Sequence, residues 1–378
     1  MDKFYYKHLS VLIMPTDWCN MNCVYCFNSR KDCKEKKVMD LKTLKKIFTS
    51  TIPYYDEIKF IFHGGEPLSM GISFYKEAFK MQKEINKNGA LISNSIQTNL
   101  TLLDEDLLKL LMENNVKIGS SFDGTQNHLT RHNTKNILKG KDLVFSNGAS
   151  VGFICVCQSK NIEHLIEDYE FFKSQKLNYT LNPYLTNDKD GDELYVESSY
   201  YVKKVCELFD YWLYDKNSKT RISYFIDFID YILFNKKSLC SYNSCLGKHI
   251  GVLYDGKIFQ CNRDFPDKYS YGNIFDYTDI RECFNSQGFK NMLSDNIKRR
   301  EKCKKECEIY DFCTGGCPNV AHLTGDMKNA NEDICLIIKG IYSHIKSKLR
   351  CICENKDQIE KLNSIVKEKI KNVNKTTF

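Results

Sequence analysis

This 378-residue chain has only six prolines and no long apolar run. With so few prolines and no low-complexity stretch, Pro-rich linkers are excluded, and no internal repeat indicates a solenoid. The longest apolar stretches, such as residues 8–15 and 151–157, are much shorter than the roughly 20 residues that span a membrane. Residues 1–10 also lack the apolar core and small-residue cleavage site of a signal peptide. We therefore expect a cytoplasmic protein with no membrane partner.

The sequence also lacks a dense Lys/Arg tract interleaved with aromatic residues. Its formal net charge of +7 comes from lysines that are scattered along the chain. A scattered excess of this kind is typical of a solvated surface, so no nucleic-acid partner is expected. Hydrophobic residues make up 42% of the chain, which predicts a folded globular protein.

Cysteine, in contrast, is abundant, with 18 residues. In a reducing compartment these cysteines favour metal or redox chemistry over disulfides.

The first two hundred residues alternate between short apolar runs and amphipathic stretches. The runs predict six strands, at residues 9–15, 58–63, 91–98, 116–122, 150–157 and 178–185. The stretches between them predict helices at residues 41–51, 73–88, 104–114 and 161–174, the third of them capped by Asp104. Repeated strand–helix alternation indicates an α/β fold with parallel strands, whose ligand site lies at the C-terminal ends of the strands.

The character of the sequence changes near residue 236. Residues 196–236 predict two helices, whereas the segment after Cys240 predicts short elements, turns and dense cysteines. The tail from about residue 337 is lysine-rich and predicts a helix. We therefore expect three parts: residues 1–236, 237–336 and 337–378.

Three cysteines, Cys19, Cys23 and Cys26, directly follow the first predicted strand. Three thiolates are one fewer than a closed zinc site or a saturated iron–sulfur cluster needs. One possibility is a zinc knuckle completed by a distant ligand. The other is a [4Fe–4S] cluster with one open iron.

The order Cys-x3-Cys-x2-Cys, with Tyr25 before the last cysteine and Phe27 after it, resembles the radical S-adenosylmethionine (SAM) family. The resemblance implies a partial (β/α)6 TIM-type barrel in which the three cysteines hold a [4Fe–4S] cluster and SAM binds its open iron. Reductive cleavage of SAM would then yield a 5′-deoxyadenosyl radical that abstracts a hydrogen atom.

Further residues at predicted strand ends match positions of this family. The stretch Gly64-Gly65-Glu66-Pro67 resembles its GGEP motif, which lies along the methionine part of SAM; an ordinary Gly-Gly turn is the alternative. The same resemblance implies cofactor contacts by Tyr25, by Ser121 with the ribose, by Arg131 with the carboxylate and by Leu185 with the adenine. Gln97 and Asn99 end the third strand and are expected to face the substrate, or else to cap the following helix.

The second half contains a second cysteine pattern. Its eight members are Cys240, Cys245, Cys261, Cys303, Cys307, Cys313, Cys317 and Cys335. Eight ligands can close two four-cysteine sites, of iron–sulfur or of zinc type.

The order of these cysteines resembles the SPASM domain of radical SAM enzymes, which holds two auxiliary [4Fe–4S] clusters. The resemblance assigns Cys240, Cys245, Cys261 and Cys317 to one cluster. It assigns Cys303, Cys307, Cys313 and Cys335 to the other. Three clusters and SAM are then the expected cofactors.

Other cysteines fall outside these patterns. Cys155 and Cys157 lie in a predicted strand and are expected to be buried apolar residues. Cys351 and Cys353 receive no role.

The reaction depends on the residue after Cys261. Chain length and cysteine order resemble anaerobic sulfatase-maturating enzymes, which oxidise a Cys or Ser of a protein to formylglycine and carry an aspartate base at that position. Here the residue is Asn262, and an amide cannot act as that base, although Asp264 lies two residues further on. The sequence QCNRDF resembles instead the Cys-x-Arg pattern of enzymes that modify ribosomally synthesised peptides.

A thioether or carbon–carbon crosslink in a ribosomal peptide is therefore the main expectation, and formylglycine formation is the alternative. The expected partners are a peptide or protein substrate and a low-potential electron donor of flavodoxin or ferredoxin type. Because the first predicted strand begins by residue 9, leader-peptide recognition would need a separate protein or direct contact with the barrel.

Overall fold

The computed structural model describes residues 6–26, 36–215, 218–238, 245–261, 266–323 and 326–352. Residues 351 and 352 are described by their backbone only. The chain divides into two compact units that interleave along the sequence. The first unit comprises Met1–Ser121, Arg131–Val151 and Cys245–Asp295; the second comprises Phe122–Thr130, Gly152–Ser244 and Asn296–Phe378. The expected domain boundaries near residues 236 and 336 stay a prediction.

A parallel sheet forms the core of the first unit. Its strands are β1 (His8–Ile13), β2 (Glu57–Phe62), β3 (Leu91–Gln97) and β4 (Lys117–Ser121), which pair in that order, as expected. On its other edge β1 pairs in parallel with β7 (His249–Val252), which forms an antiparallel hairpin with β8 (Ile258–Phe259). The carboxyl ends of β1 to β4 therefore meet at one edge of the sheet.

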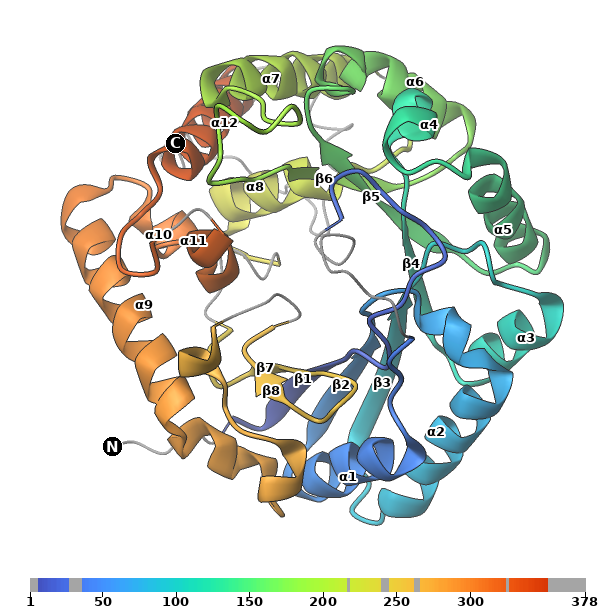
Figure 1. Ribbon diagram of the computed structural model, residues 1–378. Helices are drawn as coiled ribbons and strands as arrows, with labels where there is room; N and C mark the ends of the chain where they lie inside the picture. The colour runs from blue at the N-terminus through green and yellow to red at the C-terminus, as the bar shows by residue number, and fades with distance from the viewer. Residues whose placement is uncertain are drawn as a thin grey trace. The chain divides into compact units, whose positions relative to one another are not determined.

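Helices lie on the outside of this sheet (Figure 1). Each of them buries apolar residues on one face. They are α1 (Leu41–Thr51), α2 (Gly71–Ile85), α3 (Glu105–Glu113) and α5 (Thr134–Ser146). The predicted cap at Asp104 is present, since its carboxylate accepts a hydrogen bond of 2.8 Å from the Leu107 amide. Helix α5 was not predicted. It lies close to Leu100 because Gly140 has no Cβ, which would meet the Leu100 carbonyl oxygen at 2.5 Å.

The second unit contains the other two predicted strands and the predicted helix pair. Strand β5 (Val151–Cys157), whose first residue belongs to the first unit, pairs in parallel with β6 (Tyr179–Pro183). The helices of this unit include α4 (Asn127–Thr130), α6 (Leu165–Ser174), α7 (Ser198–Tyr214), α8 (Ser223–Phe234), α10 (Tyr310–Cys313), α11 (Pro318–Leu323) and α12 (Glu332–Ile352). Cys155 and Cys157 are buried in β5, as expected.

The cysteine-rich part differs from the expectation of short elements only. Helix α9 (Gln287–Glu306) is 20 residues long. Its buried positions follow helical spacing: Phe289, Met292, Asn296 and Arg299. Because two of these four residues are polar, the sequence shows no apolar helical periodicity at these positions. Helix α12 also begins at Glu332, earlier than the predicted tail, so that Cys335 lies in its first turn.

Short 3-10 helices connect the larger elements. They include Ile52–Tyr54, Pro67–Met70, Gly124–Gln126, Ile162–His164, Asp267–Tyr269, Ile274–Asp276 and Ile280–Asn285.

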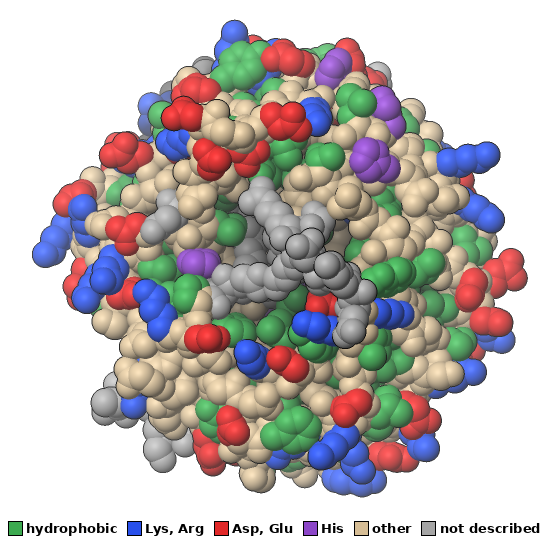
Figure 2. Space-filling view, in the orientation of Figure 1, with side chains coloured by type: hydrophobic (Ala, Val, Ile, Leu, Met, Phe, Trp, Pro, Cys, Tyr) green, Lys and Arg blue, Asp and Glu red, His purple; other side chains and the backbone are tan. Residues whose placement is uncertain are grey.

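The surface agrees with the scattered charge of the sequence. Figure 2 shows Lys and Arg side chains spread among Asp and Glu over the visible face. None of the helices in the described ranges is both long and apolar enough to cross a membrane.

Candidate active site

The first three cysteines lie in a loop, residues 15–26, that leaves the carboxyl end of β1; we call it the cysteine loop. Its entry is fixed by backbone hydrogen bonds to the Gly-Gly-Glu segment after β2. The Thr16 carbonyl accepts from the Gly65 amide at 2.9 Å, and the Trp18 carbonyl accepts from the Glu66 amide at 2.7 Å. The residues just before Cys19 are thus held against the end of the neighbouring strand.

The glycine pair permits this close approach. A Cβ on Gly65 would lie 2.0 Å from the Trp18 carbonyl oxygen, and one on Gly64 would lie 2.6 Å from that of Thr16. Gly64 also has a φ of +111°, which disfavours other residues. The contact observed for these glycines is therefore with the cysteine loop, and their predicted contact with a ligand stays a prediction.

Glu66 is a buried carboxylate that connects two strand ends. One of its oxygens accepts from the Leu68 amide (2.9 Å) and the Thr98 hydroxyl (2.7 Å), and the other accepts from the Asn99 amide (2.7 Å). Burial raises the pKa of Glu66, while these donors and the Arg131 charge act in the opposite direction. The three donors hold the carboxyl group in place, so that it connects the end of β2 to the end of β3.

Asn99 has a clearer role than the sequence suggested. Its amide nitrogen donates to the Asn20 side-chain oxygen at 2.9 Å and approaches the Cys19 sulfur at 3.7 Å. Asn20 donates in turn to the Thr101 hydroxyl at 2.8 Å. Sequence reasoning missed Asn20, because hydrogen bonds to residues 79 and 81 positions away leave no local pattern. The observed contacts of Asn99 hold the cysteine loop, and its substrate contact stays a prediction.

The same edge of the sheet brings together the other polar residues that were predicted in the first unit. Arg131 is 9% exposed, donates to the Tyr25 hydroxyl at 2.9 Å and stacks near its ring. The Gln97 amide donates to the Ser121 hydroxyl at 3.2 Å. Leu185 is half-buried just after β6, in the second unit.

The thiols of the cysteine loop are partly or wholly buried. Burial raises the pKa of Cys19 to about 11, with a smaller contribution from the Glu66 charge, against the opposing hydrogen bond from the Met21 amide. A thiol in such surroundings becomes a thiolate when a metal binds it. Three closely spaced soft ligands on a loop fit an iron–sulfur cluster with one open iron.

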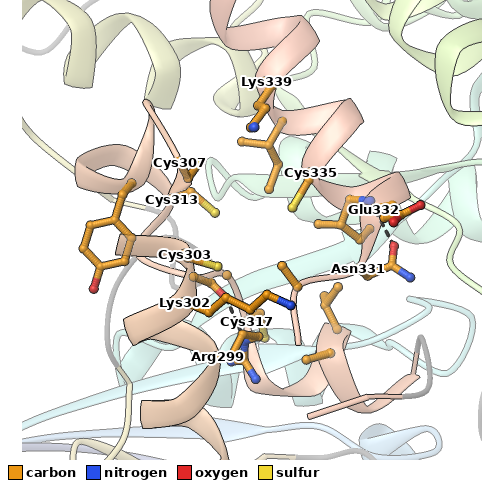
Figure 3. Close-up of a pocket in the computed structure, with 18 of the residues that line it drawn as sticks. Arg299, Lys302, Cys303, Cys307, Cys313, Cys317, Asn331, Glu332, Cys335 and Lys339 are labelled. Carbon is orange, nitrogen blue, oxygen red and sulfur yellow. Dashed lines mark hydrogen bonds between the residues drawn. The ribbon is translucent and has the colours of Figure 1, made fainter. Parts of the chain in front are cut away.

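The second unit contains a cavity of about 290 Å³. Its lining includes the four predicted ligands of one auxiliary cluster, Cys303, Cys307, Cys313 and Cys335, and also Cys317, which the resemblance assigns to the other cluster (Figure 3). Among the described residues no group of His, Cys, Asp and Glu could hold a single metal ion. Burial, with smaller contributions from the neighbouring thiols, raises the pKa of Cys313 to about 12. A cavity of this size lined by thiols fits a cluster of several atoms.

Two ligands of the other predicted auxiliary site, Cys245 and Cys261, belong to the first unit. The buried Gln260 amide donates to the Cys245 sulfur at 3.3 Å and accepts a 2.8 Å hydrogen bond from the Tyr271 hydroxyl. Neither Gln260 nor Tyr271 carries a recognisable sequence signal. Cys240, Asn262, Asp264 and Cys353 lie outside the described residues, as does the side chain of Cys351.

Two family models match the chain. The radical SAM superfamily model matches residues 13–172, and that of an iron–sulfur cluster-binding domain, SPASM, matches residues 240–308.

Curated and solved relatives extend this similarity. A cysteine-type anaerobic sulfatase-maturating enzyme of Clostridium perfringens is 29% identical over 330 residues, which is 82% of this chain and 88% of the relative. The solved structure of native anSMEcpe with bound AdoMet is 27% identical, has a TM-score of 0.82 and covers 92% of this chain and 100% of its own. A complex of that protein with AdoMet and the Cp18Cys peptide gives a TM-score of 0.81 at 26% identity, covering 92% and 99%.

Proposed function

The chain belongs to the radical SAM superfamily and carries a SPASM iron–sulfur domain, and on this premise we propose that it oxidises a Cys or Ser of a peptide or protein substrate to formylglycine. Its cofactors are SAM and iron–sulfur clusters, and its fold is the α/β partial barrel of that superfamily. The observation that carries the proposal is the similarity to the cysteine-type maturase, which extends over most of both chains. This similarity favours formylglycine formation over the crosslinking reaction that the sequence led us to expect.

The residues of the first unit would hold the reactive centre. Cys19, Cys23 and Cys26 would ligate one cluster, and the cysteines of the second half would ligate two more. When bound, these clusters would supply one-electron chemistry, by which a hydrogen atom is removed from the substrate. They would also take up the electron that the substrate then releases. Arg131, held by Tyr25, would offer its cation to the SAM carboxylate.

Formylglycine formation removes one hydrogen from the Cβ and one from the sulfur of a cysteine. Water then displaces the sulfur as hydrogen sulfide, which leaves an aldehyde. The chain must therefore supply a group that takes the thiol proton. Asn262 cannot do so, and Asp264 is the nearest carboxylate in the sequence. We assign the role of base to Asp264.

One observation favours a second candidate function. The sequence Cys261-Asn262-Arg263 lacks the carboxylate directly after the cysteine and matches the Cys-x-Arg pattern of peptide-crosslinking enzymes. In that case the product keeps its sulfur in a thioether or forms a carbon–carbon bond. Both functions call for a low-potential electron donor of flavodoxin or ferredoxin type.

A single assay separates the two candidates. The reconstituted enzyme is incubated without oxygen with SAM, dithionite and a short sulfatase-derived peptide that contains one cysteine. The product is analysed by mass spectrometry and by hydrazide capture of aldehydes. An aldehyde that has lost the sulfur supports formylglycine formation. A product that loses two hydrogens but keeps its sulfur supports crosslinking.

Two variants at the base complete this assay. Asp264→Asn should slow aldehyde formation by about 10²–10⁴, the usual contribution of a positioned base. Asn262→Asp should leave it intact or raise it. An unchanged rate in Asp264→Asn contradicts the assignment of the base while leaving the reaction itself in place.

A further inference from the structure

Arg299 is a buried cation in the second unit. It lies on α9 and its side chain is 1% exposed. Its guanidinium donates to the Gly315 carbonyl at 2.8 Å, to the Met327 carbonyl and to the Asn296 side-chain oxygen. All three acceptors are neutral, and within the described residues no carboxylate forms an ion pair with Arg299. The hydrogen bonds are satisfied, but the charge is not balanced by these contacts.

An unbalanced charge in a protein interior is strongly unfavourable unless an anion lies nearby. Burial lowers the pKa of Arg299, yet a guanidinium stays protonated in proteins. The cavity beside it is lined by the five cysteines, and Figure 3 shows Arg299 near Cys317. Thiolates at this cavity would provide the missing negative charge.

The other charged side chains of the cavity are Lys302, Glu306, Glu332 and Lys339. The first three are exposed and Lys339 is half-exposed, so water and salt screen their charges. They also include both signs. Arg299 is therefore the charged group of the lining whose field is least screened.

We propose that Arg299 is the internal counter-ion of the iron–sulfur group held by Cys303, Cys307, Cys313 and Cys335. Its charge raises the reduction potential of that group. The inference rests on the proposed assignment of these cysteines as ligands. A cluster with thiolate ligands is anionic and gains a further negative charge when reduced. A nearby cation stabilises the reduced form more than the oxidised form, and net charge is one of the factors that set cluster potentials.

The decisive variant is Asn296→Asp, which retains the hydrogen bond to Arg299 and places a carboxylate against the guanidinium. The proposal predicts that the pair becomes neutral as a whole and that the midpoint potential falls. We expect about a tenfold change in the reduction equilibrium, which is about 59 mV for one electron. Lys298→Gln on the same helix is the matched control, because it removes one unit of positive charge from an exposed side chain. It should leave the potential unchanged.

The measurement is a redox titration followed by electron paramagnetic resonance. It uses the full chain with Cys19, Cys23 and Cys26 replaced by alanine, so that only C-terminal groups contribute. A wild-type potential in iron-loaded Asn296→Asp overturns the inference, as does an equal fall in Lys298→Gln.

Two further variants decide the matter if Asn296→Asp does not load iron. Arg299→Lys keeps the charge and should retain the cluster, whereas Arg299→Gln should lose it. Equal loss in both variants would show that Arg299 acts only through its hydrogen bonds. The ligand assignment is tested separately: full iron content in Cys303→Ala would refute that assignment, whatever the role of Arg299.

Discussion

The cysteine loop of the first unit and the cysteine cavity of the second differ in the buried ionisable groups beside them. Beside the cysteine loop lie both the Glu66 carboxyl group, with three hydrogen-bond donors, and the Arg131 guanidinium, which bonds the Tyr25 hydroxyl. Beside the cavity lies Arg299, a guanidinium bonded to neutral acceptors. An anion disfavours electron uptake by a neighbouring cluster, and a cation favours it. Because the loop has groups of both signs and Arg299 has no paired carboxylate within the described residues, the comparison indicates a better electron acceptor at the cavity than at the loop.

The two sites also differ in how their ligands are positioned. The loop supplies three thiols from one short segment, whose entry is held by the backbone after β2 and by the pair Asn20 and Asn99. The cavity collects thiols from α9, α10, α12 and the segments between them. A single loop can leave one metal position open for a substrate, whereas several converging segments can close a site with four ligands.

The largest expected effect comes from removing the loop ligands. Replacement of Cys19, Cys23 and Cys26 by alanine should abolish SAM cleavage and remove about four of roughly twelve irons, given four irons per cluster. Replacement of Cys303, Cys307 and Cys313 should remove a similar number of irons and leave SAM binding in place. Metal analysis of anaerobically purified protein checks both. Zinc in the C-terminal sites would contradict the auxiliary-cluster assignment.

A smaller effect is expected from Glu66→Gln. The amide cannot accept from all three donors, so the connection between the ends of β2 and β3 loosens next to the cysteine loop. Residues that support a metal ligand typically contribute 10–100-fold in metal affinity or activity, and a fall of about that size in SAM cleavage is expected. Glu57→Gln, at the exposed start of β2, is the control. Equal rates in both variants would remove Glu66 from the support of the loop.

Arg131→Ala should weaken SAM binding by about 1–3 kcal/mol through loss of a charge-assisted hydrogen bond. Tyr25→Phe removes only the hydroxyl that holds the guanidinium at 2.9 Å and should have a smaller effect. Equilibrium binding of SAM to the reconstituted protein measures both. If Tyr25→Phe weakened binding more than Arg131→Ala, the cation would not be the main contact.

The smallest expected effect is at Tyr271, which reaches Cys245 only through Gln260. Tyr271→Phe removes the hydroxyl that orients the Gln260 amide, and so weakens the hydrogen bond to the Cys245 sulfur. Hydrogen bonds to ligand sulfurs tune cluster potentials, so the potential should shift downward without loss of iron. Tyr269→Phe is a matched control, since that buried hydroxyl bonds Asp295 instead. Identical titrations for the two variants would exclude this tuning.

The sequence sufficed for much of the fold and the positions of the expected ligands. Strands β1 to β6 were predicted because apolar runs bounded by helices are local patterns. Helix α9 was missed because Asn296 and Arg299 occupy buried positions of its inner face. Asn20, Gln260 and Tyr271 were missed because their roles depend on contacts between segments distant in the sequence. The same limit applies to Arg299, whose missing counter-charge becomes visible only in the folded chain.

The most direct test of the contrast between the two regions is a redox titration of the wild-type enzyme beside the variant that lacks Cys19, Cys23 and Cys26. The difference between the two titrations isolates the centre at the cysteine loop. The account predicts that this centre is reduced at a lower potential than the C-terminal centres, because the unpaired charge of Arg299 raises the potential at the cavity. A loop centre that is reduced first, at a higher potential than the C-terminal centres, would contradict it.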